Sequence, residues 1–170
     1  MDPHEILLHM PMFSGVSPPE LARLLALAPP VPISSESLLM DVGDQGEDLV
    51  IVLSGGFAVE LGSGEGTLPL AFVGPGEILG EAALFRRGSL RSARVRAVED
   101  GLVLRLDSSA LDELAREGNG VPRSLEEAVM RTLARRVHDS VMAIDGVLAS
   151  AFEADEPRTA FTRLKEFFRR

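Results

Sequence analysis

The sequence contains no cysteine, tryptophan or tyrosine, and it has no apolar run long enough to cross a membrane. The absence of cysteine excludes disulfides, thiolate catalysis and cysteine-ligated zinc, so packing alone must stabilise the chain. The first residues, Met1 to His4, lack the basic start of a signal peptide. Together these absences predict a cytoplasmic protein.

Groups that could bind nucleic acid or carry out catalysis are also scarce. The formal net charge of −9 argues against a protein whose main role is to bind nucleic-acid backbone. The three histidines, His4, His9 and His138, are scattered along the sequence, and no pair of carboxylates has a catalytic spacing. We therefore expect no enzyme, no metal site and no cofactor.

The arginines are unevenly distributed. No lysine or arginine occurs from Leu24 to Phe85, and then five arginines follow within eleven residues: Arg86, Arg87, Arg91, Arg94 and Arg96. A compact positive cluster in an acidic chain favours a local anion site. The alternative is a surface strand whose arginines form salt bridges with neighbouring carboxylates.

Short apolar runs divided by glycine-rich turns predict closely spaced strands. These runs are Leu38–Val42, Leu49–Leu53, Phe57–Leu61, Leu68–Val73, Arg94–Val98 and Leu102–Leu106. Before them, Ser17, Pro18 and Glu20 form a capping box that begins a helix. The predicted fold is mainly β with flanking helices (α+β), an antiparallel β-barrel or jelly roll of about eight strands with N-terminal helices and a long C-terminal helix.

One of the turns, Gly62 to Gly66, has the glycine content of a phosphate-binding loop. It lacks the lysine that follows such a loop, and it lies between two predicted strands. We interpret it as a hairpin loop.

The C-terminal third is predicted to be helical. After a short helix at Ser108–Arg116, a long helix begins near Ser124, with Glu127 completing a second capping box. Its apolar face is longer than a small barrel can cover, which favours a homodimer; folding back on its own barrel is the alternative. The face comprises Leu125, Val129, Leu133, Val137, Val141, Ile144, Leu148 and Phe152.

We divide the chain into a β-rich domain over residues 1–122, a dimerisation helix over 123–152 and a basic amphipathic tail over 153–170. The tail is expected to pack on the acidic body of its own protein, and docking on a partner or a membrane is the alternative.

The segment from Gly80 to Ala97 carries the predicted chemistry. Free backbone N–H groups at a helix start near Glu81 and the forked guanidinium of Arg91 would together suit a phosphodiester anion. Ser92 adds a hydroxyl donor, and Glu81 would accept a neutral donor such as a ribose hydroxyl. The alternative places Glu81 as a helix-dipole partner and Arg91 in solvent.

This segment resembles the phosphate-binding cassette of cyclic-nucleotide-binding domains, as found in bacterial catabolite activators, kinase regulatory subunits and gated channels. The likeness lies in Gly80-Glu81, Leu84-Phe85, Gly88, Arg91-Ser92-Ala93 and Val95-Arg96-Ala97, and weaker likeness extends from Glu5 to Phe152. It implies that the matching glutamate binds the ribose hydroxyl and that the matching arginine and serine bind the cyclic phosphate. The implied ligand-binding residues are Gly80, Glu81, Ala82, Ala83, Arg91, Ser92, Ala93 and, near the purine, Ser140.

The resemblance implies a non-catalytic regulatory sensor of a 3′,5′-cyclic nucleotide, with cAMP favoured and cGMP left open. The eighteen residues after Phe152 are too few for the helix-turn-helix of the bacterial activator, so we expect no direct DNA binding and an effector protein as partner. The alternative function is a degenerate domain that binds no ligand and serves as an interaction or dimerisation module.

Overall fold

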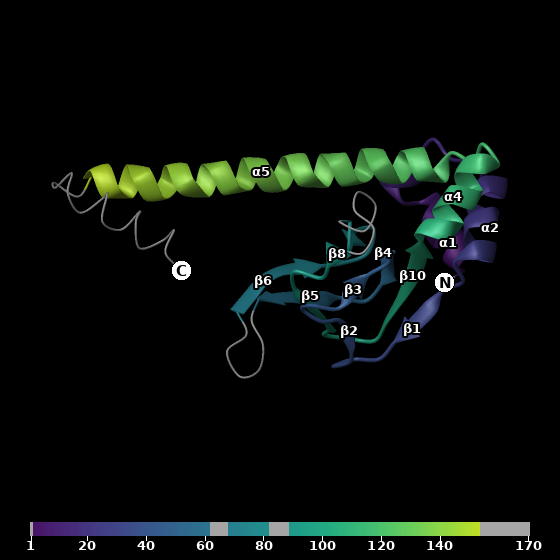
Figure 1. The fold of residues 1–170 in the computed structure, drawn as a ribbon, viewed down its shortest axis with the longest axis horizontal. Coiled ribbons are helices and arrows are strands. Elements are labelled where there is room, and N and C mark those ends of the chain that lie inside the picture. The colour runs from purple at the N-terminus through teal and green to yellow at the C-terminus, as the bar shows by residue number, and fades with distance from the viewer. Residues whose placement is uncertain (1, 62–67, 82–88, 154–170) are drawn as a thin grey trace. The chain divides into compact units, whose positions relative to one another are not determined.

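A computed structural model describes residues 2–61, 68–81 and 89–153 of the chain (Figure 1). It divides into two units, Met1–Val129 and Met130–Arg170, which are described separately. The first unit contains the strands, the N-terminal helices and the start of the long helix, whereas the second contains the rest of that helix.

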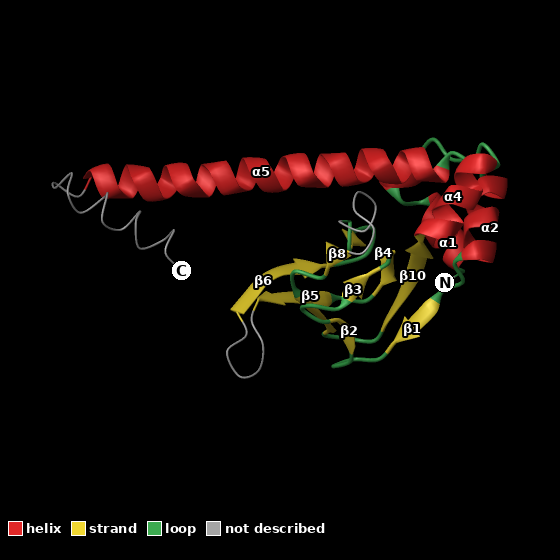
Figure 2. Ribbon diagram, in the orientation of Figure 1, coloured by secondary structure: helices red, strands yellow, loops and turns green. Residues whose placement is uncertain are grey.

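Ten strands are present in the described residues, and all of their pairings are antiparallel (Figure 2). One four-stranded sheet has the order β1-β10-β4-β7, formed by Val31–Ile33, Gly101–Asp107, Asp48–Ser54 and Ile78–Leu79. The second has the order β2-β9-β5-β6, formed by Leu38–Met40, Arg94–Ala97, Phe57–Leu61 and Leu68–Val73. The third pairs β3 with β8, which are Gln45–Gly46 and Ser89–Leu90.

The predicted mainly β fold with flanking helices is confirmed, but the sheets are not closed into a barrel. Each four-stranded sheet ends in two strands that do not pair with the other sheet. Two of these edge strands contain proline, Pro32 in β1 and Pro69 in β6. Because proline has no N–H to donate to a ladder, it restricts such strands to sheet edges.

The apolar centre of the sheets is built around β4. Its five central residues, Leu49–Leu53, are all buried, which is typical of a strand covered on both faces. On β9 the burial alternates, so Val95 and Ala97 face the core while Arg94 and Arg96 face outward. The buried cluster comprises Leu39, Met40, Val50, Val52, Phe57, Val73, Leu79, Val95, Ala97 and Val103.

Four strands were not predicted, namely β1, β3, β7 and β8. Each has only two or three residues, too few to show an alternating pattern. Gln45 and Gly46, predicted to lie in a turn, pair with Leu90 and Ser89. The predicted hairpin loop at Gly62–Gly66 lies outside the described residues, although β5 and β6 on either side of it are paired.

The first unit also contains the short helices. They are α1 (Pro3–Leu8), the 3-10 turn η1 (Pro11–Phe13), α2 (Pro18–Leu27) and α4 (Ser108–Arg116). The predicted capping box of α2 is confirmed, because the Ser17 N–H and hydroxyl both donate to the Glu20 carboxylate. In Figure 1 these helices gather at the end of the sheet where β10 leads into α4.

Helix α5 spans Val121–Glu153, so it begins before the predicted position near Ser124. The predicted capping box of Ser124 and Glu127 is therefore wrong. The Ser124 N–H donates to the Gly120 carbonyl at 3.1 Å, as an interior residue does. The N–H groups at the start of α5 are capped by Asn119 and by Glu20 of α2, so the residues around Ser124 alone mispredict where the helix begins.

Candidate functional site

Arg91 lies directly after β8, in a position fixed by backbone hydrogen bonds. Its N–H donates to the Asp44 carbonyl at 2.8 Å, and its own carbonyl accepts the Gly43 N–H at 2.9 Å. The side chain then passes over Gly46, where a Cβ would lie 3.2 Å from both Cζ and Nε of Arg91. The result is a guanidinium side chain that is only 7% exposed.

Two residues of the first unit bind the Arg91 guanidinium. Nη2 donates to the main-chain carbonyl of Asp48 at 2.8 Å and also to the Asp48 carboxylate, and Nη1 donates to the Gly80 carbonyl at 3.4 Å. Gly80 has φ +74°, and a Cβ there would lie 2.2 Å from Nη1. Both its backbone conformation and the close approach therefore require glycine at position 80.

The Asp48 carboxylate is shared between two arginines. One oxygen accepts from Arg91 and the other accepts from Nε of Arg105, which lies on the neighbouring strand β10. Since one negative charge faces two positive charges, the cluster keeps a net positive charge and can attract an anion. Asp48 was not predicted as a site residue; the available signal was the carboxylate pair Glu47-Asp48 directly before the apolar run Leu49–Leu53.

Two other arginines of the predicted cluster, Arg94 and Arg96, face outward and are paired, whereas Arg86 and Arg87 lie outside the described residues. Arg94 binds Asp41 with two hydrogen bonds of 2.9 Å, and Arg96 binds Glu60 at 2.9 and 3.1 Å. The hydrogen bond from Arg94 lowers the pKa of Asp41 and correspondingly raises the pKa of Arg94. For these two arginines the alternative interpretation, a salt-bridged surface strand, describes what is observed.

Of the predicted ligand-binding residues, Gly80 and Arg91 are brought together, with the partly buried Glu81 next to Gly80. Ser92 is exposed and Ala93 is partly buried. Ala82 and Ala83, and with them the predicted helix of the cassette, lie outside the described residues. Ser140 belongs to α5 in the second unit, and its side chain is likewise outside the described residues.

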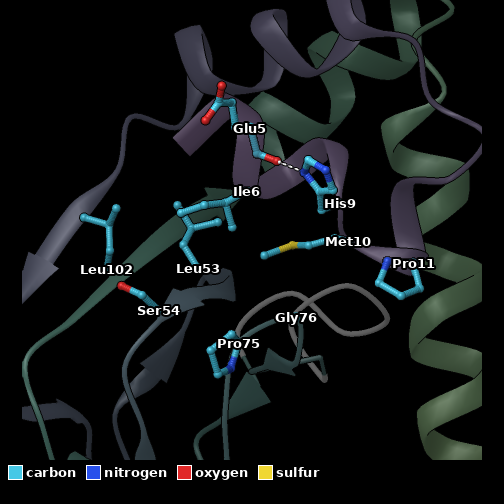
Figure 3. A pocket seen from close by; sticks show the side chains of 10 residues that line it. All are labelled: Glu5, Ile6, His9, Met10, Pro11, Leu53, Ser54, Pro75, Gly76 and Leu102. Carbon is cyan, nitrogen blue, oxygen red and sulfur yellow. Dashed lines mark hydrogen bonds between the residues drawn. The ribbon is translucent and has the colours of Figure 1, made fainter. Parts of the chain in front are cut away.

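A separate pocket of about 840 Å³ lies at the other end of β4 (Figure 3). Its walls come from α1, η1 and the residues between them, the end of β4, the start of β10 and the loop after β6. They are formed by Glu5, Ile6, His9, Met10, Pro11, Leu53, Ser54, Pro75, Gly76 and Leu102. Leu53 and Ser54 are separated from Asp48 by most of the strand, a distance of ~20 Å. The pocket is therefore not part of the Arg91 cluster, whose charge and buried donors are the better basis for an anion site.

The described residues contain no group of three histidine, cysteine, aspartate or glutamate side chains that could bind a metal ion. His4 and His9 instead bond to the main-chain carbonyls of Pro18 and Glu5, at 3.0 and 2.8 Å. Among the described helices, none is both long and apolar enough to cross a membrane.

Comparisons with known proteins agree with the architecture. The family model described as "Cyclic nucleotide-binding domain" matches residues 30–117. The Cyclic AMP receptor protein of Thermus thermophilus is 33% identical over 158 residues, which cover 91% of this chain and 68% of that protein.

Two solved structures extend the comparison. A cyclic nucleotide-binding domain from Methylobacillus flagellatus has a TM-score of 0.68 and 25% identity, covering 82% of this chain and 79% of that one. A cAMP-binding acyltransferase from Mycobacterium smegmatis has a TM-score of 0.55 and 27% identity, covering 65% of this chain and 34% of that one.

Proposed function

The chain belongs to the cyclic nucleotide-binding domain family, and on this basis we propose that it is a regulatory sensor that binds a 3′,5′-cyclic nucleotide through Arg91. The observation that carries the proposal is the buried guanidinium of Arg91, held between Asp48 and Gly80 in the segment that matches the phosphate-binding cassette.

The charge of the site suits the ligand. A cyclic phosphodiester carries a single negative charge, and the Arg91–Asp48–Arg105 cluster carries a single net positive charge. Arg91 can offer N–H groups to two phosphate oxygens, which a lysine cannot reproduce. Burial strengthens this attraction because fewer water molecules compete for the donors.

The remaining roles follow the family resemblance. Ser92 donates its hydroxyl to the phosphate, Glu81 accepts a ribose hydroxyl, and Gly80, Ala82, Ala83 and Ala93 line the site. The resemblance assigns Ser140 to the purine. The Cyclic AMP receptor protein among the relatives favours cAMP, with cGMP as the competing ligand.

In this proposal the chain is non-catalytic and acts in the cytoplasm. It signals as a homodimer through α5 to an effector protein, because the apolar side chains of Val137 and Val141 are 65% and 50% exposed on one face of the helix. No role in direct DNA binding is proposed for it.

The test is isothermal titration calorimetry with cAMP, cGMP and 5′-AMP, since the sequence has no tryptophan or tyrosine to report binding by fluorescence. Arg91→Gln and Arg91→Ala are compared with Arg94→Gln. This control removes an equal positive charge only three residues away, but from a side chain that faces outward. Losing one or two charge-assisted hydrogen bonds predicts roughly 100-fold weaker binding for both Arg91 variants. Arg94→Gln is expected to stay within about threefold of wild type.

Normal affinity in a folded Arg91→Gln variant would show that the site is wrong. If neither cyclic nucleotide binds the wild-type chain, the second candidate, a ligand-free interaction module, replaces the sensor. The observation that favours this candidate is the pairing of Arg91 with Asp48, because a guanidinium already neutralised by a carboxylate can serve a purely structural role.

A further inference from the structure

Helix α2 presents two charged side chains to the junction between α4 and α5. Glu20 and Arg23 are three residues apart, a spacing that places them on the same face of a helix. Arg23 bonds to both Glu113 and Glu117 at the end of α4. Glu20 bonds to Gly120, directly before α5. All of these residues belong to the first unit.

Both oxygens of the Glu20 carboxylate are used, and they serve different helices. Oε2 accepts the N–H and hydroxyl of Ser17, at 2.8 and 2.6 Å, which completes the capping box of α2. Oε1 accepts the Gly120 N–H at 2.7 Å. A Cβ at position 120 would lie 3.3 Å from Oε1, so the absence of a side chain at Gly120 permits this close approach.

Asn119 completes the link in the opposite direction. Its Nδ2 donates to the main-chain carbonyl of Glu20 at 3.2 Å, and its Oδ1 accepts the Val121 N–H at 2.9 Å. Asn119 therefore caps α5 and binds α2 at the same time. The start of each helix thus has a free N–H group bonded by a side chain that also reaches the other helix. Glu20 does this for α2, and Asn119 does it for α5.

The start of α5 is anchored by packing as well. Val121 and Leu125 are fully buried, and Leu21 and Leu24 of α2 are also fully buried. Apolar packing is not directional, and it does not specify at which residue a helix begins. The hydrogen bonds of Glu20 and Asn119 are directional, and they fix the residue at which α5 begins.

We propose that Glu20 is a latch that joins α2 to the start of α5, so that the N-terminal helices control whether the first turn of α5 is formed. When the bond from Glu20 to Gly120 is broken, the first turn of α5 opens while the strands and the remainder of α2 stay folded. A signal that moves α2 would thus be transmitted to α5 without passing through the sheets.

The test is amide hydrogen exchange on the full chain, comparing Glu20→Ala with Ser17→Ala. Both variants disrupt the capping box of α2, but only Glu20→Ala removes the acceptor of the Gly120 N–H. We expect the amides of Gly120, Val121, Arg123 and Ser124 to exchange at least tenfold faster in Glu20→Ala and to change by less than twofold in Ser17→Ala. The amides at positions 20 and 21, the first in α2 because Pro18 and Pro19 have no N–H, are expected to exchange faster in both variants.

Equal exchange at Gly120 to Ser124 in the two variants would overturn the proposal, because the start of α5 would then depend only on the cap of α2 or on packing. Faster exchange throughout β4 and β10 in Glu20→Ala would overturn it as well, since the effect would be global destabilisation. Asn119→Ala is a second probe of the same link, and it is expected to accelerate exchange at Val121 while Arg91 and its partners stay in place.

Discussion

At the scale of single residues, the site depends on close contact between the Arg91 side chain and the backbone of two glycines. Gly46 and Gly80 lie beside the guanidinium, and at both positions a Cβ would lie 3.2 Å or less from an Arg91 side-chain atom. Gly80 has a second requirement, because its φ of +74° is unfavourable for other residues. These contacts hold the donors of Arg91 in place before a ligand arrives, which reduces the ordering cost of binding.

Gly80→Ala is predicted to be more damaging than Gly76→Ala. Gly76 also has a positive φ, of +84°, but a Cβ there meets nothing within 4 Å. Gly76→Ala should therefore lower the free energy of unfolding by about 1 kcal/mol, from backbone strain alone. Gly80→Ala adds the clash with Arg91, for a total loss of roughly 2–4 kcal/mol, and weakens cyclic-nucleotide binding at least tenfold. Urea unfolding and calorimetry measure both, and equal effects of the two variants would contradict the close approach at Gly80.

At the scale of elements, α5 changes character along its length. Its first part is buried, with Leu125 and Val129 almost fully covered, whereas Met130, Val137 and Val141, which share one face, are at least half exposed. Monomeric proteins rarely leave such a row of apolar side chains exposed to water. A second copy of the same helix would cover them symmetrically, which is the basis of the proposed homodimer.

The double substitution Val137→Glu and Val141→Glu tests this interface. Burying unpaired carboxylates is costly, so the dimer is expected to weaken at least 100-fold. Light scattering would then report the chain mass of 18.2 kDa instead of twice that value. His138→Glu is the control, because His138 is also exposed and lies beside Val137 on a different face of the helix. Dissociation by the control, or a wild-type chain that is already monomeric, would exclude this interface.

At the scale of the whole molecule, a strongly acidic chain is organised by local pairing of charges. The carboxylates of Glu20, Asp41 and Glu117 all have lowered pKa values, caused mainly by hydrogen bonds from Ser17, Arg94 and Arg23 respectively. A carboxylate with a lowered pKa stabilises the folded chain above its unfolded pKa. That stabilisation is lost as the pH falls through the lower, folded value.

We therefore predict that the melting temperature falls as the pH is lowered below about 4.5, the region where free carboxylates titrate. Asp41→Asn isolates one contribution. Its melting temperature should lie a few degrees at most below that of wild type at pH 7, and the difference should shrink as the pH falls. Calorimetric scans from pH 7 to pH 3 provide the measurement, and a difference that is independent of pH would show that Asp41 does not act through its charge.

The sequence by itself determined the features that depend on neighbouring residues. The capping box at Ser17 and Glu20, the helix at Ser108–Arg116, and strands such as Phe57–Leu61 and Leu68–Val73 follow from local propensity and periodicity, and all are observed. The cassette pattern also identified Gly80 and Arg91, which the fold brings together.

Tertiary structure alone decided which groups meet across long stretches of chain. The pairing of Arg91 with Asp48 joins residues 43 positions apart, and the bond from Glu20 to Gly120 joins residues 100 positions apart. No local pattern specifies such partners, because they are set by how the sheets and helices pack. For the same reason the start of α5, the two-residue strands and the open sheet edges were not predicted: each depends on hydrogen bonds, made or missing, with segments distant in sequence.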